Sequence, residues 1–88
     1  MSIKRFFYTR DFKKEVYRFS PKQKKKISYR VDLFLKDPFI PLLKTHKLKG
    51  KLKNYWSFSV SANLRIMFRF ADKESVEFID LGTHEIYK

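Results

Sequence analysis

The pattern of hydrophobic and polar positions in the first part of the chain predicts one strand and then a helix. The segment from Ile3 to Tyr8 is rich in aromatic residues and begins abruptly, as strands do. Thr9 is a potential helix cap. After it, hydrophobic residues recur at the i, i+4 and i+7 spacing of one buried helical stripe: Phe12, Val16 and Phe19.

A second helix is marked by clearer boundary signals. Residues Ser20 to Gln23 form a capping box with Pro21 at the first helical position, and the Asp37-Pro38 step ends the helix. Between these boundaries the hydrophobic stripe runs through Ile27, Val31, Phe34 and Leu35. Lysines and arginines occupy the other face, so the two basic amphipathic helices are expected to form a hairpin.

The second half of the chain changes to the period-two alternation of strands. After an irregular segment from Phe39 to Gly50, hydrophobic and polar residues alternate along 55–61 and 64–70, and a third strand is expected over 76–81. Short turns join these strands into an antiparallel meander. The predicted fold is therefore a single α+β domain over residues 1–88, in the order β-α-α-β-β-β. Its two-helix hairpin packs on one face of a curved, mainly antiparallel, four-stranded sheet.

The charge balance narrows the partners of this domain. Twenty-one Lys and Arg against nine Asp and Glu give a formal charge of +12 on 88 residues. Such a surface attracts polyanions, so nucleic acid, an anionic membrane and an acidic protein are candidate partners, beside the alternative of lysines that only keep the protein soluble. The chain has no cysteine for a disulfide or a zinc site. No apolar run approaches the roughly 20 residues that cross a bilayer, and no signal-peptide pattern is present, so a cytoplasmic location without membrane contact is expected.

Once the helices cover one sheet face, few residues with useful chemistry remain for the other face. If Ile66 faces the helices, Arg65 faces away, where its guanidinium either binds a phosphate or is simply solvated. The two histidines, His46 and His84, are natural proton-transfer groups at neutral pH, although a single histidine in such a setting is more often a surface or capping residue. Tyr87 is either a stacking platform for a base or an anchor for the tail. No metal-ligand pattern and no phosphate-binding glycine loop is evident, so no metal and no cofactor is expected.

Four segments in this order resemble the RelE/ParE toxin superfamily, in particular its RelE and YafQ branches. They are H-K-L-K-G at 46–50, the Tyr55-Trp56 pair, N-L-R-I-M-F at 63–68 and D-L-G-T-H-E-I-Y at 80–87. The resemblance implies the toxin of a type II toxin–antitoxin system, a metal-independent endoribonuclease that cuts messenger RNA, usually at the ribosome. In that reaction the 2′-hydroxyl attacks the adjacent phosphate and leaves a 2′,3′-cyclic phosphate and a 5′-hydroxyl. A cognate acidic antitoxin is the implied protein partner.

The resemblance also implies roles for individual residues. Arg65 matches the arginine that holds the phosphate, and His46 matches the histidine that looks catalytic in YafQ-like members. His84 matches a position for the general acid or base. Tyr87 matches the C-terminal aromatic residue that stacks on or orients the substrate. Salt-sensitive contacts with the RNA backbone are assigned to a basic set: Lys47, Lys49, Lys51, Lys53 and Arg69.

Departures from the family pattern keep two alternatives open. RelE-like members often place basic residues where this chain has Ser57 and Ser59, and YafQ-like members carry a histidine and an aspartate nearest to Ser59 and Asn63. One alternative is therefore a catalytically degenerate relative that binds RNA or its partner without cleaving. The other is a ParE-like inhibitor of DNA gyrase that acts by binding, although the two histidines count against it.

Overall fold

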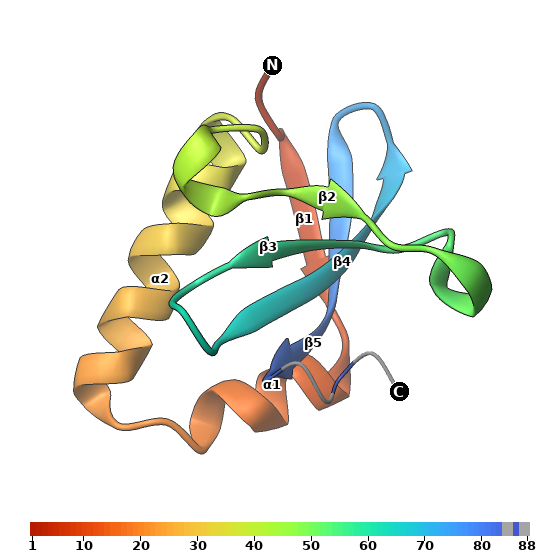
Figure 1. Cartoon of the computed structure of the whole chain (residues 1–88). Coiled ribbons are helices and arrows are strands. Elements are labelled where there is room, and N and C mark those ends of the chain that lie inside the picture. Colours follow the sequence, from red (N-terminus) through yellow and green to blue (C-terminus); the bar gives the residue numbers. More distant parts are fainter. Residues whose placement is uncertain (84–85, 87–88) are drawn as a thin grey trace.

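The computed structural model describes residues 1–83 and Ile86. A five-stranded sheet in the order β1-β5-β4-β3-β2 carries the two helices of the hairpin (Figure 1). The elements in chain order are β1 (Arg5–Tyr8), α1 (Arg10–Tyr17), α2 (Pro21–Lys36), the 3-10 turn η1 (Pro41–Leu43), β2 (His46–Lys47), the 3-10 turn η2 (Gly50–Leu52), β3 (Trp56–Ser59), β4 (Arg65–Asp72) and β5 (Ser75–Gly82). In Figure 1 α2 rises along the left of the sheet, α1 lies below it, and the β2–β3 loop with η2 projects on the right.

Both helices begin where the sequence predicts. Thr9 caps α1, because its Oγ1 accepts the N–H of Phe12 at 3.1 Å, and the same hydroxyl donates to the carbonyl of Ile79 at 2.6 Å. Ser20 caps α2 in a capping box, with reciprocal bonds of 3.2 Å between its own groups and those of Gln23. Among the described helices, none combines the length and the apolar character needed to cross a membrane.

The core is a cluster of aromatic rings between the helices and the sheet. Phe34 of α2 is fully buried, stacks on Phe58 of β3 with ring centroids 4.4 Å apart, and meets Phe68 of β4 edge-on at 4.6 Å. Phe78 of β5 joins this cluster and also stacks on Phe12 of α1 at 5.4 Å. Burying one such side chain contributes about 1.5–3 kcal/mol, so these rings hold both helices on a small sheet.

The sheet differs from the predicted one by an additional edge strand. β2 pairs antiparallel with β3, with His46 opposite Ser57 and Lys47 opposite Trp56. The four-stranded prediction was wrong here, because a strand of two residues is too short to show period-two alternation in the sequence. At the other edge β1 pairs in parallel with β5, and the remaining pairs are antiparallel. The α+β class, the helical hairpin on a mainly antiparallel sheet and the order of the other elements are confirmed.

Candidate nucleic-acid interface

The strand register places two of the predicted site residues on one face of the sheet. Arg65, at the start of β4, lies opposite Ser59, and His46 lies opposite Ser57. Ser57 and Ser59 are two positions apart on β3, so all four side chains point to the same side of the sheet. Phe58 between them points the other way and is fully buried in the core. The side that carries His46 and Arg65 is called the open face below.

The open face is accessible at His46 and closed at its centre. His46 is exposed and Arg65 is half-buried, whereas Ser57 is fully buried. Met67 lies next to Ser57 on β4 and is only 7% exposed, and Asp80 continues the row on β5. Ser57 is therefore covered and not accessible to a ligand. The accessible groups of this face, such as His46, lie around it.

A main-chain carbonyl orients the imidazole of His46. Its Nδ1 lies 3.0 Å from the carbonyl oxygen of Lys44. Because a carbonyl oxygen only accepts hydrogen bonds, Nδ1 carries the hydrogen in this contact and the free lone pair is on Nε2. Nε2 is therefore the nitrogen that is able to accept a proton from a ligand.

The lysines predicted to bind RNA lie at the rim of the open face and beyond it. Lys47 pairs with Trp56, so it points to the opposite side of the sheet from His46. Lys51 lies in η2, and Lys49 and Lys53 flank this turn. All four lysines are exposed, and the η2 loop projects from the domain (Figure 1). They supply positive charge around the face rather than contacts within it.

Arg69 lies further along β4 on the same side as Arg65, but its guanidinium already has a partner. Its Nε donates to Oε1 of Glu77 on β5 at 2.8 Å, and both side chains are partly exposed. Exposed ion pairs are weak, so a phosphate can compete with Glu77 for this arginine.

His84 and Tyr87 lie outside the described residues, and their roles stay predictions. The structure does describe Ile86, which lies between them in the chain. A Cβ added to Gly82 would lie 2.6 Å from Cγ2 of Ile86. Since Gly82 is directly opposite Arg65, this contact lies on the side of the sheet that carries Arg65, and Ile86 also lines a hollow with Glu15 of α1 and with Phe19.

Asp80 is an ionisable residue of this row that the sequence did not single out. Burial raises the pKa of its carboxyl, and the nearby carboxylates of Glu15 and Asp11 on α1 raise it further, against the N–H of Leu81, which donates to Oδ1 at 2.8 Å and lowers it. The effect depends on how α1 packs beneath β5, which cannot be read from any local sequence pattern.

Within residues 1–83 and Ile86, no three His, Cys, Asp or Glu side chains gather as a metal site requires.

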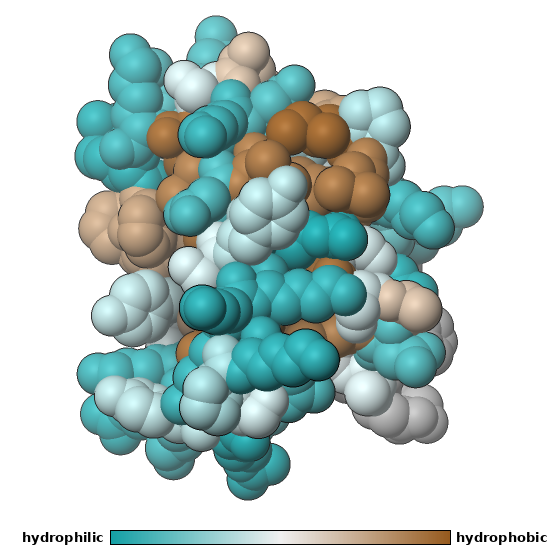
Figure 2. Space-filling model, turned by 90° about the vertical axis from the view of Figure 1, so that its left-hand side faces the viewer, coloured by the Kyte–Doolittle hydropathy of each residue, from teal (hydrophilic) through white to brown (hydrophobic). Residues whose placement is uncertain are grey.

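Arg65 also lines a pocket whose other cations were not predicted. The pocket has a volume of about 330 Å³ and lies between α2, the end of η1 and the β3–β4 turn. Its cations are Lys26, Arg30, Lys44 and Arg65, and these four residues define the basic pocket. Arg30 donates from Nη1 to the carbonyl of Ser59 at 3.2 Å. In Figure 2, which views the molecule from the side of α2, hydrophilic side chains cover most of the surface. Three separate segments of the chain form the pocket, so no single sequence motif predicts it.

Comparison with known proteins identifies the fold. No protein-family model matches the chain, and no curated protein does. Among solved structures, a YoeB/ParE toxin from Agrobacterium tumefaciens matches with a TM-score of 0.78 at 24% identity, over 92% of this chain and 99% of that chain. The E. coli DinJ–YafQ toxin–antitoxin complex matches with 0.75 at 20% identity, over 98% and 97%. The archaeal RelE–RelB complex from Pyrococcus horikoshii OT3 matches with 0.72 at 10% identity, over 94% and 96%.

The chain has the RelE/ParE toxin fold.

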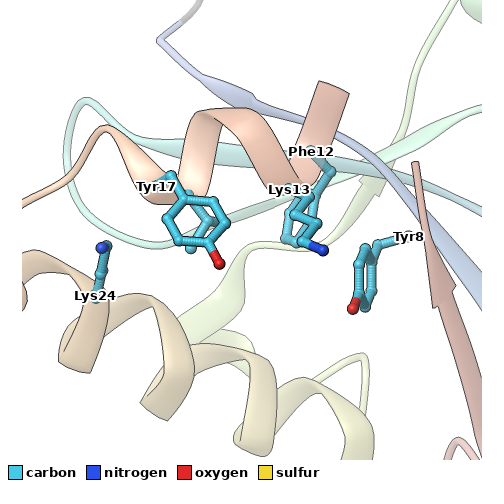
Figure 3. Close-up of a pocket in the computed structure, with 6 residues that line it drawn as sticks. Tyr8, Phe12, Lys13, Tyr17 and Lys24 are labelled. Carbon is cyan, nitrogen blue, oxygen red and sulfur yellow. The ribbon is translucent and has the colours of Figure 1, made fainter. Parts of the chain in front are cut away.

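The domain has a second accessible surface, between β1, α1 and α2 (Figure 3). A hollow of about 320 Å³ there is lined by Tyr8, Phe12, Lys13, Val16, Tyr17 and Lys24. The Nζ of Lys24 lies 5.2 Å from the centre of the Tyr17 ring, within cation–π range. Beside the hollow, edge strand β1 exposes about half of each of its aromatic side chains, Phe6, Phe7 and Tyr8. Exposed aromatic residues on an edge strand are typical of a surface that a partner covers.

Proposed function

We propose that this protein is the toxin of a type II toxin–antitoxin system and that it cleaves messenger RNA without a metal ion. One observation carries the proposal: His46, whose Nδ1 contacts a main-chain carbonyl, and Arg65, whose guanidinium is able to bind a phosphate, share the open face of a strongly basic domain. The RelE/ParE fold supports the toxin class. Attack by the RNA's own 2′-hydroxyl needs a base and a cation at one surface, and no metal.

The proposed reaction forms a bond from the 2′-oxygen to the adjacent phosphorus and breaks the bond from that phosphorus to the 5′-oxygen. Nε2 of His46 takes the 2′-hydroxyl proton, because Nδ1 is engaged with the carbonyl of Lys44. Arg65 neutralises the charge that develops on the phosphorane oxygens. The family resemblance implies that His84 is the acid or the base, so with His46 as the base His84 is left to protonate the leaving 5′-oxygen. Tyr87 orients a base, as the resemblance implies. The products are a 2′,3′-cyclic phosphate and a 5′-hydroxyl.

The exposed lysines extend this site into a longer RNA-binding surface. Positive side chains on the β2–β3 segment make contacts with phosphates that weaken steeply with salt. These side chains are Lys47, Lys49, Lys51 and Lys53. Arg69 joins them where a phosphate replaces Glu77. A basic loop that projects from the domain suits the ribosomal RNA around a bound messenger, so we propose that cleavage occurs on the ribosome.

The proposed protein partner is an acidic antitoxin that covers the hollow between β1, α1 and α2. An amphipathic segment would bury Tyr8 and Val16 under its apolar side, while its carboxylates meet Lys13 and Lys24. The matching DinJ–YafQ structure is itself a toxin–antitoxin complex, which supports a partner of this type. Replacing Lys24 with Glu should weaken binding of the acidic protein encoded beside this gene at least tenfold by calorimetry. Lys14→Glu, an exposed residue of α1 outside the hollow, is the matched control.

The decisive experiment is cleavage of messenger RNA by the purified protein, with and without ribosomes, followed by mapping of the new ends. His46→Gln should slow cleavage by about 10²–10⁴-fold, as expected for loss of a general base, and Arg65→Gln should slow it at least as much. Arg10→Gln is exposed on α1 and serves as the control for the removal of one positive charge. Any cleavage that occurs in the ribosome-free reaction should persist when a chelator is added.

Each alternative function predicts a different outcome of this experiment. Cleavage that persists in both variants would show that other residues perform the chemistry. Binding of RNA without cleavage would identify a degenerate relative. If the protein neither binds nor cuts RNA, a DNA supercoiling assay tests the remaining alternative, inhibition of gyrase.

A further inference from the structure

We propose that the basic pocket beside Arg65 holds a second backbone phosphate of the RNA, next to the phosphate that reacts. The proposal rests on the proposed function, since it takes RNA as the ligand. It adds a binding position formed by α2 and the end of η1, outside the open face. Arg65 borders both places, so one strand of RNA passes it and continues around the β3–β4 turn.

Among the described residues, no carboxylate balances the four cations of the basic pocket. No aspartate or glutamate lines the pocket, and among the described residues none of its cations makes an ion pair. In other parts of the molecule, by contrast, Arg5, Arg18 and Arg69 each lie within 4 Å of a carboxylate oxygen. Like charges gathered in one hollow repel each other unless an anion enters. The uncompensated charge therefore points to an anionic ligand.

Arg30 is held at the wall of the pocket by the sheet. Its Nη1 donates to the carbonyl of Ser59, the residue directly opposite Arg65. Arg30 of α2 and Arg65 of β4 are thus both next to Ser59 of β3, Arg30 by a hydrogen bond and Arg65 by strand pairing. An arginine has five N–H donors and this bond uses one of them, so the planar group is oriented while donors remain for phosphate oxygens.

Lys44 connects the basic pocket to the proposed general base. Lys44 lines the pocket, and its carbonyl accepts the hydrogen bond from His46. Its backbone φ is 50°, the left-handed region in which glycine or asparagine is favoured. This conformation costs a residue with a side chain roughly 1–2 kcal/mol, so the fold holds Lys44 in place against a local penalty. A phosphate bound at Lys44 would fix the carbonyl that orients His46.

The composition of the basic pocket favours RNA over a segment of the acidic partner. Hydroxyl groups of Ser59 and Ser61 stand among its cations, and Leu42 and Ala62 are its apolar residues. The hollow at β1 is instead largely aromatic and aliphatic, as an amphipathic protein segment requires. Phosphate oxygens are strong acceptors for the guanidinium groups and for the Ser61 hydroxyl of this lining, whereas the Ser59 hydroxyl donates to the carbonyl of Ser61 at 3.4 Å.

The test measures binding of a short, fluorescently labelled, single-stranded RNA whose 2′-O-methyl riboses prevent cleavage. The Lys26→Gln/Arg30→Gln variant removes two pocket cations. The Lys22→Gln/Lys25→Gln variant removes two exposed lysines of the same helix that lie outside the pocket. We expect the pocket variant to bind about tenfold more weakly than the control. Its slope of log affinity against log salt should fall by about 0.7, because one phosphate of the RNA is no longer neutralised by the protein.

The outcomes separate this proposal from the proposed function. Equal affinities and slopes in the two variants would overturn the pocket assignment, while cleavage by the wild-type protein would still support the ribonuclease. If the wild-type protein neither binds nor cleaves RNA, both proposals fail. Weaker binding of polyglutamate with unchanged binding of RNA would assign the pocket to an acidic protein and overturn the proposal. Lys26→Gln alone, which leaves the Arg30–Ser59 bond in place, gives the same test if the double variant does not fold.

Discussion

Ile86 packs so closely on Gly82 that no side chain fits between them, since a Cβ on Gly82 would lie 2.6 Å from Cγ2 of Ile86. Gly82 lies directly opposite Arg65, and the contact is therefore beside the proposed phosphate site. The φ of Gly82 is not in the left-handed region, so its backbone conformation does not require glycine. Glycine is needed here because Ile86 approaches too closely for a side chain. The end of β5 is thereby joined to the open face.

Replacing Gly82 with alanine is expected to displace Ile86. The activation free energy of RNA cleavage should rise by more than the free energy of unfolding falls. A contact of 2.6 Å cannot persist, so Ile86 must rotate or move away, at a cost of about 1–3 kcal/mol. Cleavage rates and thermal melting of the same samples measure the two effects. The Gly82→Ala/Ile86→Ala variant removes the clashing methyl group and should melt higher than the sum of the single changes predicts. Strict additivity would mean that this contact has no energetic role.

Replacing Asp80 with asparagine is expected to raise the melting temperature at pH 7. The pKa of Asp80 is raised in the folded protein, so the folded state holds this proton more tightly than the unfolded chain does. Its contribution to stability is favourable below the ordinary aspartate pKa and is lost as pH rises through the raised value. Asparagine removes that loss and keeps an acceptor for the N–H of Leu81.

The gain at pH 7 should be below about 1 kcal/mol, or a few degrees, because the carboxyl is only partly buried. It should disappear as the pH falls below the ordinary aspartate pKa. The control is Asp32→Asn, which removes the same charge from an exposed position on α2. A matching rise in the control would attribute the effect to net charge and not to the surroundings of Asp80.

Local signals made the helices predictable, whereas the site depends on contacts that the sequence does not display. The capping box at Ser20 and the spacing of buried residues such as Phe34 each lie within one helix, and the structure confirms them. β2 exists only because His46 and Lys47 pair with a strand further along the chain. Two residues are too few to carry a periodic signal of their own, so this strand escaped prediction.

The same distinction explains which site residues were found. The alternation along β4 is enough to predict that Arg65 faces away from the core. The approach of Arg30 to Ser59 requires the packing angle of α2 on the sheet, and the pocket position of Lys44 requires a left-handed turn at a lysine. Neither follows from residue spacing, since both are properties of the assembled tertiary structure.

Replacing Thr9 with valine is expected to destabilise the fold by about 2 kcal/mol. Valine has a similar shape but loses the cap on the N–H of Phe12 and the hydrogen bond to the carbonyl of Ile79. The loss corresponds to a fall in melting temperature of roughly 8–16 °C for a domain of this size. Thr9→Ser keeps the hydroxyl and should melt close to the wild-type protein. A lower melting temperature for Thr9→Ser than for Thr9→Val would mean that the methyl group, and not the hydroxyl, stabilises this junction of α1 and β5.

Replacing Glu77 with glutamine is expected to strengthen RNA binding, because it releases Arg69 from its ion pair on the open face. The slope of log affinity against log salt should steepen by about 0.7, the contribution of one additional phosphate contact on a single strand. Stability should change little, since exposed ion pairs contribute about 1 kcal/mol or less. Glu74→Gln is the matched control, because it removes the same charge and releases Lys4, whose Nζ lies 2.9 Å from the Glu74 carboxylate in the turn directly before β5. If both variants steepen the slope equally, the RNA responds to total charge and Arg69 does not contact it; a steeper slope in Glu77→Gln alone places a phosphate on β4 at Arg69.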